Sequence, residues 1–279
     1  MLGAIIGDIV GSRFEFREDD NRRKSFAFFT SDCRPTDDTF MTIAVAKALL
    51  LSKGDDEKLK AVIADCMKEV AAAHPHTDWG ARFYKWLFID KPSRPYNSFG
   101  NGSAMRISPV GWVADSEKDV VRLSKIVTEI THNHPEGIKG AEAVAMGVYL
   151  ARTGADKDYI RQRLSEYYSE LKDPDFTIDN IYGHYGYDDD GMWVTCQGSV
   201  PQAIVAFLDG TDFEDVVRNA VYIGGDSDTI GAMAGSIAEA YYGVPLSLEM
   251  QATDYLSDDL KSIYYAFETI KRKRVVRQS

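Results

Sequence analysis

Two short segments of this chain combine paired carboxylates with threonine hydroxyls, one at residues 35–39 and one at residues 224–229. Their acids are Asp37, Asp38, Asp226 and Asp228. Carboxylate and hydroxyl oxygens are hard ligands, which suit Mg²⁺, Mn²⁺ or Ca²⁺ better than zinc or copper. If the fold brings the two segments together, they can form the two halves of one cation site.

The acids also have an ordinary structural interpretation, because both segments run into apolar stretches with the spacing of a helix. Aspartate at a helix start caps free backbone N–H groups and lies at the positive end of the helix dipole. That explanation suffices for one segment alone. It is weaker for two segments of parallel composition, since four clustered carboxylates repel one another strongly without a cation.

Helical periodicity dominates the rest of the chain. Apolar residues recur every three or four positions in the stretches 40–51, 58–73, 120–130, 141–151, 159–171, 200–208, 213–223, 230–242 and 260–270. Strand patterns are scarce, and no linker rich in Pro, Gly or Ser divides the 279 residues. We predict one all-α domain over residues 1–279. The helix that begins near Asp228 is rich in Gly and Ala, so it should approach its neighbours closely at the centre of a bundle.

Composition narrows the class of protein. A formal net charge of −11 argues against a general nucleic-acid or anionic-membrane binder, because binding to phosphates needs excess Lys and Arg. Three cysteines without a CxxC pair fit a reducing compartment and argue against zinc. No apolar run approaches the roughly 18 residues that cross a bilayer, and an acid comes too early for a signal-peptide core. We expect a cytoplasmic monomer, with the basic run 271–274 as a solvated tail.

Residues 98–106 form a third segment of interest. Gly100 and Gly102 would leave backbone N–H groups free to hold a phosphate in front of a following helix, although Gly-Asn-Gly is also a common turn. Phe99 could stack on an aromatic base, but core packing is the usual role of a single Phe.

Two further segments carry polar side chains. His132 and His134 form an HxH pair, which without other His or Cys more often marks a loop or a helix end than a metal site. Near the N-terminus, Asp8, Ser12 and Glu15 fall at helical spacing and could share a face. Glu15 could equally be a solvated surface residue.

These segments resemble the ADP-ribosylglycohydrolases, all-α enzymes that remove ADP-ribose from modified targets with two metal ions, usually Mg²⁺ or Mn²⁺. The matching segments occur in the family's order and cover residues 3 to 243. They are Gly7-Asp8-x-x-Gly11 with Glu15, Thr36-Asp37-Asp38-Thr39, Ser98-Phe99-Gly100-Asn101-Gly102 with Ala104-Met105-Arg106, Thr131-His132, and Gly225-Asp226-Ser227-Asp228-Thr229. The resemblance implies a single compact, orthogonal bundle of many helices.

The resemblance also implies roles for individual residues. It implies two Mg²⁺ or Mn²⁺ ions held by Thr36, Asp37, Asp38, Asp226, Asp228 and Thr229. It places Glu15 beside the metals and makes Glu15 and Asp38 the candidates for the carboxylate that exchanges protons with water and the leaving group. It assigns substrate binding to Ser98, Phe99, Gly100, Asn101, Gly102 and His132. Phe99 stands where many members have Tyr, which preserves stacking on adenine but removes a hydroxyl hydrogen bond.

We therefore expect a metal-dependent hydrolase that cleaves the glycosidic bond between ADP-ribose and an arginine or serine side chain of a modified protein. Two alternatives stay open: a hydrolase of a free ADP-ribose derivative or related nucleotide glycoside, and a non-catalytic ADP-ribose-binding relative. The complete set of implied metal ligands favours an enzyme. The tyrosines and acids of residues 173–197 are expected to form part of the rim that meets the target.

Overall fold

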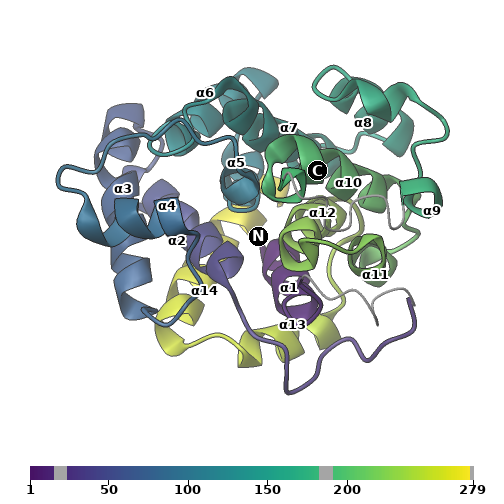
Figure 1. Ribbon diagram of the computed structural model, residues 1–279, viewed down its shortest axis with the longest axis horizontal. Coiled ribbons are helices and arrows are strands. Elements are labelled where there is room, and N and C mark those ends of the chain that lie inside the picture. Colours follow the sequence, from purple (N-terminus) through teal and green to yellow (C-terminus); the bar gives the residue numbers. More distant parts are fainter. Residues whose placement is uncertain (16–23, 182–190, 277–279) are drawn as a thin grey trace.

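The computed structural model describes residues 1–15, 24–181 and 191–276, with side chains as far as Lys271. In these residues the chain forms fourteen α-helices and no strand apart from one isolated bridge between Gly100 and Thr195, which confirms the predicted all-α fold (Figure 1). The helices are α1 (Leu2–Gly11), α2 (Asp37–Ser52), α3 (Asp56–Ala73), α4 (Ala81–Tyr84), α5 (Ser108–Val113), α6 (Glu117–Thr128), α7 (Pro135–Arg152), α8 (Lys157–Leu164), α9 (Ile178–Ile181), α10 (Cys196–Asp209), α11 (Phe213–Ile223), α12 (Ser227–Tyr242), α13 (Leu246–Asp254) and α14 (Asp258–Val276).

Two helices, α1 and α12, pack against each other in the middle of the molecule (Figure 1). Every residue of α1 is buried. A Cβ at Gly7 of α1 would lie 1.9 Å from the carbonyl oxygen of Gly231, and one at Gly3 would lie 2.0 Å from that of Gly235. Only glycine lets two backbones come so close. The close approach predicted for the Gly- and Ala-rich helix α12 is thereby confirmed.

Other helices surround this central pair. Helix α2 packs on α1, α12 and α3, while α7, α10 and α11 cover other sides of α12. The buried apolar side chains form one continuous cluster that reaches from Met1 to Phe267. This core fixes the ends of α1, α2 and α12 relative to one another, and those three ends carry the acidic residues.

The structure differs from the sequence prediction in the extent of some helices. The stretch predicted as a helix over 159–171 is α8, which ends at Leu164, followed by a turn and a short 3₁₀ segment at Ser169–Lys172. Leu164, Tyr168 and Leu171 are all buried. The spacing of these apolar residues therefore predicts correctly that they are buried, although the helix ends before the last two of them.

The prediction of a solvated basic tail is wrong for its first residue. Helix α14 extends to Val276, and the Lys271 ammonium contacts the carboxylates of Glu239 and Glu268, the latter at 3.1 Å. Two buried acids need a cation beside them, which explains why Lys271 turns inward.

Two expectations from composition can be compared with the described residues. Cys33, Cys66 and Cys196 are all free and buried, so the structure pairs none of them in a disulfide. In the part of the chain that the structure describes, no helix is both long and apolar enough to cross a membrane.

Candidate metal centre

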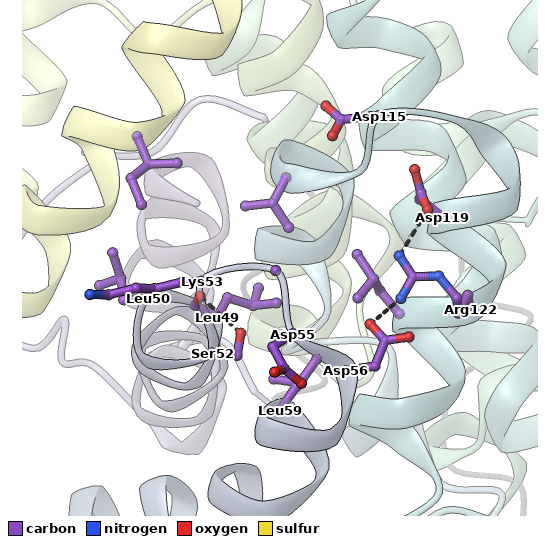
Figure 2. Close-up of a pocket in the computed structure, with 14 residues that line it drawn as sticks. Leu49, Leu50, Ser52, Lys53, Asp55, Asp56, Leu59, Asp115, Asp119 and Arg122 are labelled. Carbon is purple, nitrogen blue, oxygen red and sulfur yellow. Dashed lines mark hydrogen bonds and ion pairs between the residues drawn. The ribbon is translucent and has the colours of Figure 1, made fainter.

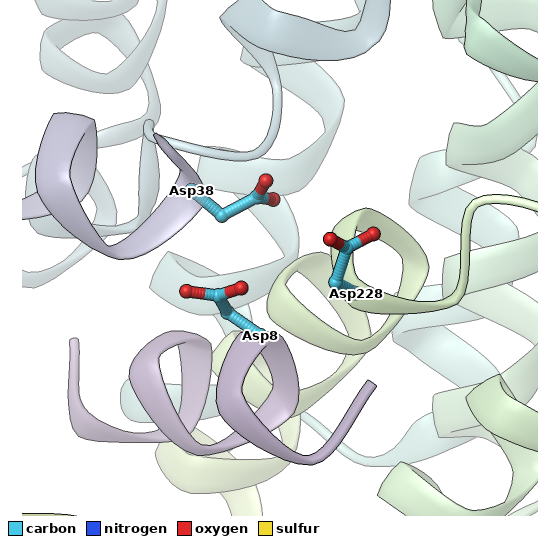
Figure 3. A group of neighbouring side chains, drawn as sticks. All are labelled: Asp8, Asp38 and Asp228. Carbon is cyan, nitrogen blue, oxygen red and sulfur yellow. The ribbon is translucent and has the colours of Figure 1, made fainter. Parts of the chain in front are cut away.

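Three helix ends meet at one end of the central pair: the last turn of α1, the first turn of α12 and the first turn of the neighbouring helix α2. They bring Asp8, Asp38 and Asp228 together, with one carboxylate oxygen of each within 4.8 Å of the others (Figure 3). Glu15, Asp226 and Asp228 form a second group with the same spacing. The two acidic segments of the sequence therefore do meet, and two acids from the N-terminal segment join them.

Asp8 holds the start of α2 in place. Its Oδ2 accepts hydrogen bonds from the backbone nitrogens of Thr36 (2.9 Å) and Thr39 (3.1 Å) and from the Thr39 hydroxyl. Its Oδ1 accepts one from the Thr36 hydroxyl at 2.7 Å. A carboxylate has about four lone-pair sites, and these four bonds match that number. Asp8 thus anchors the segment that carries Asp37 and Asp38.

Further hydrogen bonds join the acidic segments to each other and to the 98–106 segment. The Thr229 hydroxyl donates to Oδ2 of Asp38 at 3.3 Å, which links α12 to α2. The side-chain amide of Asn101 donates to Oδ2 of Asp226 at 2.6 Å. Two segments near opposite ends of the chain and a loop between them are therefore held in one network.

Burial raises the pKa of every carboxyl group in this cluster. It raises the pKa of Asp8 to about 6, that of Glu15 to about 7 and that of Asp37 to about 8. The pKa of Asp38 and that of Asp228 lie well above the ordinary range for the same reason. Repulsion between neighbouring carboxylates adds to burial for all of these except Asp8, where hydrogen bonds from Thr36 and Thr39 partly offset it.

The donor set fits a hard divalent cation. Oδ1 of Asp38 is buried and has no hydrogen-bond partner among the described residues. A buried carboxylate oxygen without a donor is costly. A cation supplies the missing partner and also favours the ionised form of the surrounding acids. Neither three-residue group contains His or Cys, as expected for such an ion.

Glu15 reaches the cluster by a different route from the one expected. Helix α1 ends at Gly11, with Ser12 as its C-cap, so Glu15 does not share a helical face with Asp8. A turn after the helix carries it instead to the carboxylates of Asp226 and Asp228. Glu15 is neither a helical residue nor a solvated surface residue.

A cavity of about 430 Å³, called the main cavity below, opens on the carboxylate cluster. Its lining includes Ser98, Asn101, Gly102, His132, Arg82, Arg106, Tyr96 and five of the six predicted metal ligands, the sixth being Thr36. Gly100 and Phe99 are absent from that lining. Phe99 is instead 41% exposed, with its ring 5.2 Å from that of His134. The helix expected directly after Gly102 is only a 3₁₀ turn at Asn101–Ser103, and α5 begins at Ser108.

The protonation of His132 follows from its neighbours. The buried guanidinium of Arg106 donates to the Thr131 hydroxyl at 2.7 Å, and that hydroxyl lies 2.7 Å from Nδ1 of His132. Because an arginine can only donate, the Thr131 proton is available to Nδ1, and Nε2 then carries the histidine's own proton. Burial, together with Arg106 and Arg82, places the pKa of His132 well below its usual value. A neutral His132 therefore presents an N–H donor to the main cavity.

His134 has a different role, the helix-end role that the sequence favoured. Its Nδ1 accepts a hydrogen bond from the backbone nitrogen of Glu136 at 3.1 Å, which caps the start of α7. Within the described residues neither histidine belongs to a metal-sized cluster.

A second cavity of about 300 Å³, called the side cavity, also touches the cluster. It lies between residues 34–40 and the turn of residues 73–78, and it includes Thr36 in its lining. A third cavity, of about 370 Å³, lies at the other end of α2, where Arg122 pairs with Asp56 and Asp119 (Figure 2). The third cavity shares no lining residue with the other two.

Sequence reasoning missed several residues of this site. The anchoring role of Asp8 was not foreseen, although its place between Gly7 and Gly11 in a buried apolar helix was a usable signal. Arg82 gave no signal, because it belongs to the short helix α4, which carries no legible periodicity. Of the stretch 173–197 proposed for the target-facing rim, residues 182–190 lie outside the described residues, and they include Tyr182, Tyr185, Tyr187 and Asp188 to Asp190.

Comparison with known proteins places this geometry in context. A family model described as ADP-ribosylglycohydrolase matches residues 1–264. ADP-ribosylhydrolase ARH3 of Homo sapiens is 26% identical, with 96% of this chain and 92% of that protein covered. ADP-ribosyl-[dinitrogen reductase] glycohydrolase of Rhodospirillum rubrum is 27% identical, with 87% and 84% covered.

One solved structure extends the likeness to the fold. An ADP-ribosylglycohydrolase-related protein complex superposes with a TM-score of 0.66 at 23% identity, covering 97% of each chain. At 23% identity this match supports the shared helical fold alone.

Proposed function

Since the chain belongs to the ADP-ribosylglycohydrolase family, we propose that it is a metal-dependent hydrolase that cleaves the glycosidic bond between ADP-ribose and a modified protein side chain. The observation that carries the proposal is the meeting of both acidic segments at the floor of the main cavity. That arrangement supplies a cation site and a substrate-sized space in one place.

In this proposal two Mg²⁺ or Mn²⁺ ions are held by the predicted ligands Thr36, Asp37, Asp38, Asp226, Asp228 and Thr229. When bound, such ions fix the hydroxyls of the distal ribose and make a coordinated water a better nucleophile. Hydrogen bonds of Asp8, Asn101 and the Thr229 hydroxyl hold the segments that carry these acids together.

The main cavity offers donors of the kind that a diphosphate needs. Arg82 and Arg106 belong to its lining and carry positive charge, and His132 contributes the Nε2–H donor. Charge-assisted hydrogen bonds of this type are the strong ones in phosphate recognition. Ser98 and Gly102 line the same space, so this loop stays part of the proposed substrate site.

For proton transfer we favour Glu15 over Asp38. Asp38 already accepts from Thr229 and belongs to the proposed metal ligands. Glu15 lies outside that ligand set and lines both the main and the side cavity, where it can reach water and leaving group. A carboxylate so placed can serve as general acid and then as general base.

A panel of substrates tests this function. Release of ADP-ribose is measured from arginine-linked and serine-linked peptides and from small ADP-ribose esters, each with Mg²⁺, Mn²⁺ or excess chelator. The proposal predicts metal-dependent release from at least one peptide. Release only from the small esters would favour the alternative, a hydrolase of free ADP-ribose derivatives. Tight binding of ADP-ribose without any release would identify a non-catalytic binder.

A further inference from the structure

Two cavities open on the same carboxylates. The main and side cavities share the lining residues Glu15, Asp37, Asp78 and Asp228 and no others. The proposed function places ADP-ribose in the main cavity, because Arg82, Arg106 and His132 line that cavity and not the side cavity. The side cavity then has no assigned occupant.

The way in which the atoms of a glycoside are joined suggests an occupant for the side cavity. In ADP-ribose the distal ring is joined to the diphosphate through its 5′ carbon, whereas the bond to be cleaved is at the anomeric carbon across the ring. With the ring at the carboxylates and the diphosphate in the main cavity, the leaving group must point elsewhere. We propose that the side cavity is the leaving-group subsite, an inference that rests on the proposed function.

The lining of the side cavity fits a flat cation. His74 stacks on Phe40 with ring centroids 4.2 Å apart and planes at 11°, and both residues line the side cavity; this ring pair is called the aromatic wall below. The lining also includes Asp78, whose side chain is 99% exposed and lies 4.0 Å from Arg34. Outside the proposed metal ligands, the lining holds the carboxylates of Glu15 and Asp78 and one permanently charged cation, Arg34. This balance favours a positive over a negative occupant.

A guanidinium uses both kinds of partner, stacking on aromatic faces and pairing with carboxylates. The side cavity therefore takes the arginine side chain of a modified target. A serine-linked substrate would place a short neutral side chain there and would use neither the aromatic wall nor Asp78.

A matched pair of variants tests the subsite. Ala73 is exposed at the end of α3 and lines only the side cavity, whereas Ala81 is exposed at the start of α4 and lines only the main cavity. Ala73→Phe should lower kcat/KM for an arginine-linked peptide about tenfold or more by filling the space, while the Kd of free ADP-ribose stays within about twofold of wild type. Ala81→Phe should weaken free ADP-ribose binding. Thermal unfolding of both variants checks that they fold.

If Ala73→Phe turned over an arginine-linked peptide as fast as the wild-type protein does, the subsite assignment would be overturned. A loss of ADP-ribose affinity in Ala73→Phe as large as that in Ala81→Phe would also overturn it. These outcomes differ from failure of the proposed function, which would appear as no release from any substrate by the wild-type protein.

A second variant tests the guanidinium itself. Asp78→Asn should lower kcat/KM for the arginine-linked peptide by about 2- to 5-fold, the range expected for one exposed ion pair. The serine-linked peptide should be unaffected. Equal effects on both peptides, or faster wild-type turnover of the serine-linked one, would overturn the assignment to arginine.

Discussion

Replacing Asp8 is the sharpest way to test how the acidic cluster is assembled. In Asp8→Ala, the backbone nitrogens of Thr36 and Thr39 lose their only acceptor shown in the structure, and both hydroxyls lose a partner. Each buried donor left unsatisfied costs about 1–3 kcal/mol. Two such nitrogens destabilise the fold by roughly 2–6 kcal/mol, less what is gained by removing one carboxylate from a crowded cluster.

Asp8→Asn provides the matched control. An amide oxygen at the position of Oδ2 can still accept the bonds from both nitrogens and from the Thr39 hydroxyl, and the Thr36 hydroxyl can rotate to accept from the amide nitrogen. The Asn variant should therefore keep the fold and the position of Asp37 and Asp38. The Ala variant should lose both.

The assay is thermal unfolding combined with Mg²⁺ titration. For a chain of this size 1 kcal/mol corresponds to about 2–4 °C in Tm, so Asp8→Ala should lower Tm by roughly 5–20 °C. Its Mg²⁺ affinity should fall by about 10- to 100-fold, as when a group that orients metal ligands is removed. Asp8→Asn should stay within a few degrees of wild type. A wild-type Tm and Mg²⁺ affinity in Asp8→Ala would refute the anchoring role.

Three more predictions follow from the same geometry. Without metal, the raised folded-state pKa values of Asp8 (about 6) and Asp37 (about 8) mean that the folded chain holds more protons than the unfolded one from about pH 4 to about pH 8. Stability should therefore fall as pH rises through that range, by about 1.4 kcal/mol per pH unit for each extra proton. Saturating Mg²⁺ should flatten the slope, and equal Tm–pH curves with and without Mg²⁺ would contradict this. Gly7→Ala drives a Cβ into the Gly231 carbonyl oxygen and should lower Tm by more than about 10 °C. Gly80→Ala, where a Cβ meets no atom within 4 Å, should change Tm little. Thr131→Val removes the hydroxyl between Arg106 and His132, so the ¹⁵N shifts of His132 should show a changed tautomer and ADP-ribose should bind more weakly, with Thr131→Ser restoring both.

The parts of the site that could be predicted from the sequence are those with a distinctive local composition. The acidic segments could be predicted because carboxylates beside hydroxyls are uncommon in pairs, and because Pro35 and the apolar stretches around them mark helix starts. Helix α11 was predicted with its observed bounds, Phe213–Ile223, since its apolar face is strongly periodic.

Other parts depend on tertiary contacts that no local pattern encodes. Asp8 is an anchor only because the glycines of α1 and α12 bring the two helices together beside α2. Helix α13 escaped prediction because its apolar residues alternate along the sequence and so lie on two opposite faces of the helix, one exposed (Leu246 and Met250) and one buried (Leu248 and Ala252). The inward turn of Lys271 requires two acids from different helices. Each of these features exists only after the chain has folded.

The central claim is that the two acidic segments are halves of one dinuclear centre that drives hydrolysis. The most direct measurement is Mn²⁺ bound per chain at equilibrium, with the rate of ADP-ribose release recorded on the same samples, for wild type, Asp37→Ala and Asp228→Ala. We predict two Mn²⁺ per wild-type chain, with release that rises as the second ion binds, and fewer ions with almost no release in both folded variants. Folded variants that still release ADP-ribose at the wild-type rate in excess chelator would contradict the account.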